Sequence, residues 1–152
     1  MDAKELLERY KAGERDFTGV KLPGVRLMDI NLSGIILRDA DLSNAYLDGI
    51  TLIYADLTRA NLRKAHLAEA AFNGANLEGA DLSYVFCLQT SLSEVNLSHA
   101  KLRKAKLTET SFLDSNLSYA DFSGARDFEI YGCRGATFYE TIMPDGSIKR
   151  EG

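Results

Sequence analysis

The chain has 152 residues, which suits one compact domain, and its formal net charge of −4 favours neither a nucleic-acid-binding protein nor an acidic tail. It contains no run of 18 apolar residues, so neither a transmembrane helix nor any other membrane role is expected. The N-terminus lacks the apolar segment of a secretory signal, and the two cysteines are too few for a disulfide framework. We therefore expect a cytoplasmic protein.

A short helix is predicted at the N-terminus, over about residues 3–12. Asp2 and Glu5 form the pattern of a capping box, and Gly13 suits the left-handed position that follows a helix. The apolar side of this helix would consist of Leu6, Leu7 and Tyr10. We expect residues 1–13 to form a cap that covers the end of the structure that follows.

The central part of the chain has an apolar residue at every fifth position. From Phe17 to Phe122 there are 22 such positions, of which 17 are Leu, four are Phe and one is Cys87. In an α-helix, side chains five residues apart point to different sides of the axis, and in a β-strand they point to opposite faces. Neither element can therefore bury all these residues together. A second inward set, two residues earlier, is small or β-branched from Val20 to Ala80. A chain that turns a corner at each unit, with four corners of roughly 90° in a coil, buries both sets between stacked coils.

The recurring unit A-[D/N]-L-x-x resembles the repeat of the pentapeptide-repeat family. It occurs as ADLTR, ANLRK, ANLEG, ADLSY and ADFSG, and the match covers roughly residues 15–143. The resemblance implies an all-β fold, a right-handed quadrilateral β-helix with four repeats per coil and about six coils, which we assign to residues 14–143. At roughly 4.8 Å per coil this solenoid would be about 29 Å tall. We also expect the Asp and Asn between the two inward sets to exchange hydrogen bonds between coils.

The repeat changes phase near the C-terminus. Phe122 is followed by Phe128, six residues on, which predicts an extra residue near 126–127 that bulges a corner. Residues 144–152 begin with Pro-Asp-Gly, a tight-turn signal that predicts a short hairpin or loop over the last coil. Alternatively, the last coil stays open and pairs with a second molecule, as the resemblance allows. The expected state is a monomer or a homodimer through this C-terminal end.

No catalytic, cofactor-binding or metal-binding residues are predicted. His66 and His99 occupy outward positions on different faces, and neither has a partner at metal-ligand spacing. Cys87 and Cys133 occupy inward positions, where buried structural thiols are expected. A tightly packed solenoid also has no interior pocket, so we expect a protein that is not an enzyme.

One outward face is the candidate protein-binding surface. If four repeats make a coil, residues 20 apart stack, and one column contains Arg26, Tyr46, His66, Phe86 and Lys106. The next outward column contains Met28, Asp48, Ala68, Leu88 and Thr108. From these columns the candidate binding residues are Met28, Tyr46, His66, Phe86 and Leu88. An apolar patch can mark a partner site, whereas the alternative is that these side chains only stack between coils and stabilise one wall.

A second face gathers basic residues around a tyrosine: Arg63, Lys64, Ser83, Tyr84, Arg103 and Lys104. Such a cluster can bind nucleic acid or another anion. Asp41, Asp81 and Asp121 share the same wall, however, so a solvated face of mixed charge is favoured and nucleic acid is an unlikely partner.

These observations lead to two functional hypotheses. The first is a protein–protein interaction scaffold with an unidentified protein partner. The second, implied by the resemblance, is inhibition or protection of a DNA-handling enzyme such as gyrase by mimicry of duplex DNA. Residues 14–126 contain 14 acidic and 12 basic side chains, a net of two negative charges. A DNA duplex presents about 17 negative charges over a length of about 29 Å. This solenoid would therefore carry far less negative charge than the duplex that it would mimic.

Overall fold

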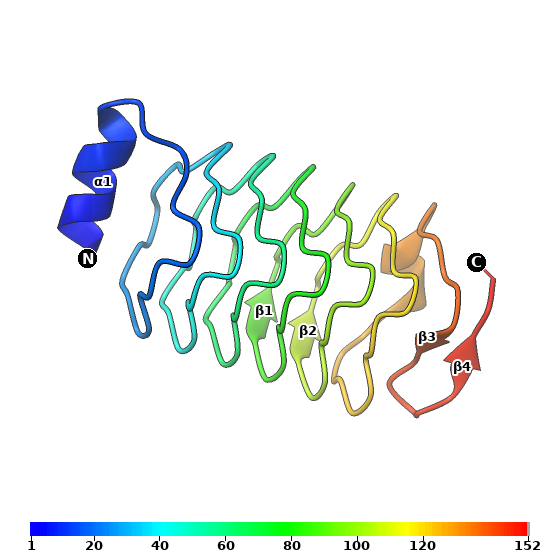
Figure 1. Ribbon diagram of the computed structural model, residues 1–152. Helices are drawn as coiled ribbons and strands as arrows, with labels where there is room; N and C mark the ends of the chain where they lie inside the picture. Colours follow the sequence, from blue (N-terminus) through cyan, green and yellow to red (C-terminus); the bar gives the residue numbers. More distant parts are fainter. Residues whose placement is uncertain (152) are drawn as a thin grey trace.

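The residues that recur at every fifth position line the inside of a β-helix. The computed structural model describes residues 1–151, in which the chain coils repeatedly between an N-terminal helix and a C-terminal hairpin (Figure 1). All 22 fifth-position residues from Phe17 to Phe122 are buried, and none is more than 3% exposed. The smaller set also points inward, with ten consecutive members from Ile35 to Ala80 fully buried. The core is therefore a single column of Leu and Phe enclosed by close-packed walls.

The coils are held in register by parallel backbone pairing. From Asp16↔Ile36 to Lys106↔Arg126, paired residues lie 20 positions apart, so one coil contains four five-residue units. Most of these contacts are single-residue bridges because a turn follows within three residues. Two longer parallel strands form where the repeat departs from its usual sequence, β1 (Phe86–Leu88) and β2 (Lys106–Thr108).

Each corner requires a residue in the left-handed region. The φ angle is 58° at Asn44 and 71° at Gly49, and positive φ recurs at this place along the chain. The Asp or Asn that starts the corner uses its side chain locally: both the Ser43 N–H and its hydroxyl donate to Asp41 Oδ1, at 3.0 and 2.7 Å. The N–H two residues later donates in the same way to each Asp or Asn of this set: 31, 41, 56, 61, 76, 81, 96, 116 and 121. The Oδ1 atoms therefore serve their own turns and do not form the expected ladders. Within residues 1–151, side-chain hydrogen bonds between coils reach this set only at the second oxygens of Asp56 and Asp81, which accept from Arg38 at 3.0 Å and Arg63 at 3.3 Å.

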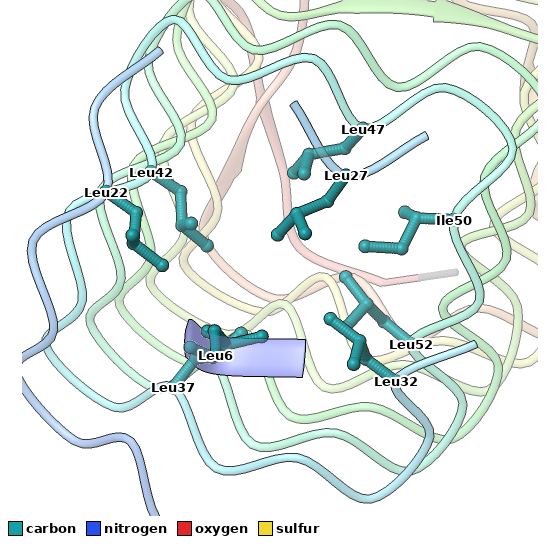
Figure 2. Close-up of a pocket in the computed structure, with 9 residues that line it drawn as sticks. All are labelled: Leu6, Leu22, Leu27, Leu32, Leu37, Leu42, Leu47, Ile50 and Leu52. Carbon is teal, nitrogen blue, oxygen red and sulfur yellow. The ribbon is translucent and has the colours of Figure 1, made fainter. Parts of the chain in front are cut away.

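The N-terminal end is closed by α1 (Ala3–Lys11). Asp2 Oδ1 accepts a hydrogen bond from the Glu5 N–H at 2.9 Å, and Gly13 has a φ of 101°, as the capping pattern predicts. Leu6 is fully buried over the first coils, where the remaining gap measures about 10 Å³ and is lined only by Leu and Ile (Figure 2). The Tyr10 hydroxyl also donates to the Ser33 carbonyl at 2.7 Å. A gap of this size holds at most one water molecule, so α1 seals the core.

The C-terminal end accommodates one extra residue. After the pair Lys106↔Arg126 the spacing becomes 21, as in Asn116↔Thr137, and the short helix η1 (Ile130–Cys133) lies in the intervening segment. The extra residue is therefore absorbed close to the predicted position. β3 (Thr141–Ile142) and β4 (Ile148–Lys149) then pair antiparallel, so the predicted hairpin is present and its turn includes the Pro-Asp-Gly segment.

Candidate functional site

The predicted column is a continuous stack of side chains on one wall. Parallel pairing joins each member to the next: Arg26↔Tyr46, Tyr46↔His66, His66↔Phe86 and Phe86↔Lys106. The Tyr46 and His66 rings are stacked with centroids 4.8 Å apart, and His66 lies 6.3 Å from Phe86. Arg26 Cζ lies 4.6 Å from the Tyr46 ring, and Lys106 Nζ lies 5.4 Å from the Phe86 ring. We call these five residues the aromatic column; it has aromatic rings in the middle and a cation at each end.

The five predicted binding residues fall into a continuous group and an outlying one. Tyr46, Phe86 and Leu88 are each 36–37% exposed, and His66 is half-buried between the first two. Leu88 shares strand β1 with Phe86 and therefore borders the aromatic column. Met28 is equally exposed at 37%; it lies one coil from Tyr46 but three coils, or about 14 Å, from Leu88. The structure thus gathers four of the five residues and places Met28 at the edge.

The backbone beneath this face is fixed. Cys87, between Phe86 and Leu88, is fully buried and pairs with Leu107 on β2. Thr90, two residues after Leu88, is buried, and its hydroxyl donates to the Leu67 carbonyl at 2.7 Å. The cross-coil stacking that the sequence suggested is present between Tyr46 and His66, and the backbone beneath Phe86 belongs to the paired, buried wall.

A second stacked aromatic group escaped the sequence reading. The rings of His99 and Tyr119 are stacked 4.6 Å apart, and Tyr119 contacts Tyr139 at 5.5 Å. Both tyrosines are almost half exposed. These three residues also lie 20 positions apart, so the spacing that identified the aromatic column would have found this group as well.

The basic residues around Tyr84 share their wall with carboxylates, as expected. Arg63 Nη1 lies 3.3 Å from Asp81 Oδ2, and Arg103 Nε lies 3.7 Å from Asp121 Oδ2. Both arginine side chains stay largely exposed. The face is of mixed charge, with cations outermost.

The two thiols of the chain lie inside the core. Cys87 and Cys133 are free and buried, and burial raises the pKa of the Cys87 thiol to about 12 and that of Cys133 to about 11. Thiolates are scarce at such pKa values, so both side chains serve as packing groups. Within residues 1–151 no three His, Cys, Asp or Glu side chains are placed to hold a metal ion. The same residues include no helix long and apolar enough to span a membrane.

Comparison with known proteins supports the repeat assignment. A family model described as pentapeptide repeats, with 8 copies, matches residues 26–63, 45–83 and 90–126, more than half of the chain. The resemblance drawn from the repeated unit is thereby confirmed. An uncharacterized protein, slr1819 of Synechocystis sp. strain PCC 6803, is 56% identical over 41 residues. That match covers 27% of this chain and 12% of slr1819, so this chain spans only a small part of its relative.

Three solved structures were compared with this chain, and one of them, a pentapeptide repeat protein, shares its fold. The crystal structure of alr5209, a pentapeptide repeat protein from Nostoc PCC 7120, is 30% identical with a TM-score of 0.60, covering 91% of this chain and 96% of that one. HetL, involved in heterocyst differentiation regulation in Nostoc sp. strain PCC 7120, is 27% identical with a TM-score of 0.37 over 98% and 100%. QnrB1, a plasmid-mediated fluoroquinolone resistance protein, is 16% identical with a TM-score of 0.47 over 82% and 91%.

Proposed function

Because this chain belongs to the pentapeptide-repeat family, we propose that it is a non-enzymatic scaffold that binds a protein partner in the cytoplasm. The observation that carries the proposal is the exposed patch formed by Tyr46, His66, Phe86 and Leu88 on a rigid wall. Aromatic side chains held in one orientation lose little entropy on binding, and such residues dominate the energy of protein interfaces. Met28 extends the patch toward α1.

The charges around the patch indicate the chemistry of the partner. Arg26 covers one end of the aromatic column and Lys106 covers the other. A complementary surface would place an apolar segment over the rings and carboxylates beside the two cations. We expect such charge pairs to affect the association rate and its salt dependence more than the affinity.

The proposal is tested by replacing one ring with a charge. Phe86→Asp should leave the melting temperature close to that of wild type, because the side chain is 37% exposed and lies beside Lys106. Tyr119→Asp is the matched control, since it alters a stacked and exposed ring of the second aromatic group. Both variants and wild type are used as bait in lysate of the source cells, and bound proteins are identified by mass spectrometry.

A partner retained by Tyr119→Asp and lost by Phe86→Asp supports the proposal, and titration calorimetry with the purified partner then measures its affinity. Identical lists for all three baits, or a partner lost only from Tyr119→Asp, would show that the aromatic column serves wall packing. Light scattering on the same preparations distinguishes the monomer from a homodimer through the C-terminal end.

The charge distribution disfavours the DNA-mimic alternative. Besides the low net charge, several surface carboxylates are paired with arginines, including Asp56 with Arg38 at 3.0 Å and Asp39 with Arg59 at 2.8 Å. These pairs reduce the negative field that a duplex mimic would need. We therefore expect no inhibition in a gyrase supercoiling assay at micromolar protein concentrations, and inhibition there would favour mimicry over the scaffold.

A further inference from the structure

A recess opens on the wall next to the aromatic column. Its volume is about 200 Å³, and its walls are formed by Arg63, Ser83, Tyr84, Arg103 and Lys104. We call this site the basic recess. Three of its five side chains are cationic, and none is acidic. The recess is separate from the proposed protein-binding patch, so the two sites can be tested independently.

Ser83 carries the only side-chain oxygen or nitrogen within residues 1–151 that is buried and without a hydrogen-bond partner. Its side chain is 1% exposed and lines the recess. Ser43 occupies the same place two coils earlier, after the same Asp-Leu pair, and its hydroxyl donates to Asp41 at 2.7 Å. A buried hydroxyl without a partner is unfavourable, so its presence beside three cations suggests that a ligand atom completes it.

The cationic side chains of the basic recess are held in place, but their hydrogen-bond donors are only partly used. Arg63 and Arg103 each approach a carboxylate through one long contact, at 3.3 and 3.7 Å, whereas Arg59 makes two bonds to Asp39, at 2.8 and 3.1 Å. The Tyr84 ring lies 5.4 Å from Arg63 Cζ and 5.8 Å from Lys104 Nζ. Cation–π contact therefore orients these two groups, and Arg63 keeps N–H donors besides the Nη1 that donates to Asp81.

We propose that the basic recess binds a phosphate group. Arg63, Arg103 and Lys104 supply the positive charge and N–H donors that a phosphate dianion prefers, and the Ser83 hydroxyl supplies a neutral donor from the floor. The volume exceeds that of one phosphate, and the half-exposed Tyr84 ring borders the remaining space. Both free phosphate and a small phosphorylated molecule with a flat organic part share this chemistry.

The test is a titration followed by amide NMR of the ¹⁵N-labelled full chain. Inorganic phosphate and phenyl phosphate are added at constant ionic strength, with chloride as the blank. Saturable shifts are expected at the amides of Ser83, Tyr84 and Lys104. Tighter binding of phenyl phosphate would identify a phosphorylated organic ligand that uses Tyr84, and equal or weaker binding would identify free phosphate. The absence of saturation up to about 20 mM of either probe would overturn the proposal.

Matched variants separate the basic recess from general charge effects. Arg103→Gln should weaken phosphate binding at least about tenfold, whereas Arg38→Gln, which removes a partly exposed arginine from another wall, should not change it. Ser83→Ala should weaken binding several-fold, and Ser43→Ala should leave it unchanged. Equal losses in Arg103→Gln and Arg38→Gln would show nonspecific attraction and overturn the site. These side chains lie on the surface or at corners, so we expect each variant to fold. Melting temperatures verify this.

Discussion

Leu62 tests the inward position of the fifth-residue set. It is fully buried in the middle of the solenoid and lies between Leu42 and Leu82 of the adjacent coils, which are also buried. Replacing Leu62 with Ala removes three carbon atoms from this column. Because each coil buries its side chains only against its neighbours, the structure has few ways to fill the space.

The expected loss follows from transfer and cavity terms. At about 0.8 kcal/mol for each buried methylene, transfer alone costs about 2.4 kcal/mol. The residual cavity raises the total to about 3 kcal/mol, within the range observed for buried Leu→Ala changes. Leu62→Asp should prevent folding altogether, because it would bury an unpaired charge.

Urea unfolding at pH 7 measures the effect, followed by far-ultraviolet circular dichroism and by tyrosine fluorescence, since the chain has seven Tyr and no Trp. Leu113→Ala is the control because Leu113 is 40% exposed at an outward position, and its loss should stay below about 0.5 kcal/mol. Equal stabilities of Leu62→Ala and Leu113→Ala would refute the assignment of inward and outward positions.

Three further predictions address the thiols, the corners and acid stability. Cys87 and Cys133, with pKa values raised by burial to about 12 and about 11, should react with a thiol reagent at pH 8 only after urea unfolding; rapid labelling of the folded chain would contradict their burial. Gly34→Ala should cost about 1 kcal/mol in urea unfolding, because φ is 73° and nothing lies within 4 Å of the added carbon; an unchanged midpoint would contradict this. Hydrogen bonds from the Ser43 hydroxyl and N–H lower the pKa of Asp41. The contribution of this carboxylate to the free energy of unfolding is therefore complete above the unfolded-state pKa of about 3.9 and is lost as the pH falls below that value. Stability should therefore drop below about pH 4, and by less in Asp41→Asn; an identical drop in both proteins would exclude this carboxylate.

Most of the fold could be predicted because one spacing determines which residues face inward and which stack. A period of five fixes the inward residues, and a coil of four units fixes which outward residues stack. Tyr46, His66 and Phe86 could therefore be grouped from the sequence alone, and the structure places their rings in contact. The cap could be predicted as well, since Asp2 determines the start of α1 by accepting a hydrogen bond from the Glu5 N–H.

The features that escaped prediction depend on side-chain orientation. Ser43 and Ser83 follow the same Asp-Leu pair, yet one hydroxyl is bonded to its turn and the other is buried without a partner. Likewise, the sequence shows that Asp and Asn recur, but not that their oxygens are used by their own corners. Such choices are made between rotamers of similar energy, and the neighbouring coils decide them.

Pairing between residues 20 positions apart makes the length of this protein adjustable in whole coils. Deleting residues 47–66 would join Tyr46 to Leu67 and preserve both the period of five and the pairing of all remaining coils. Phe86 would then take the place of His66 against Tyr46, and the cations at the two ends would move closer by about 4.8 Å. Duplication or loss of one such segment during evolution would therefore change the distance between two displayed side chains by a fixed increment, without requiring a new core.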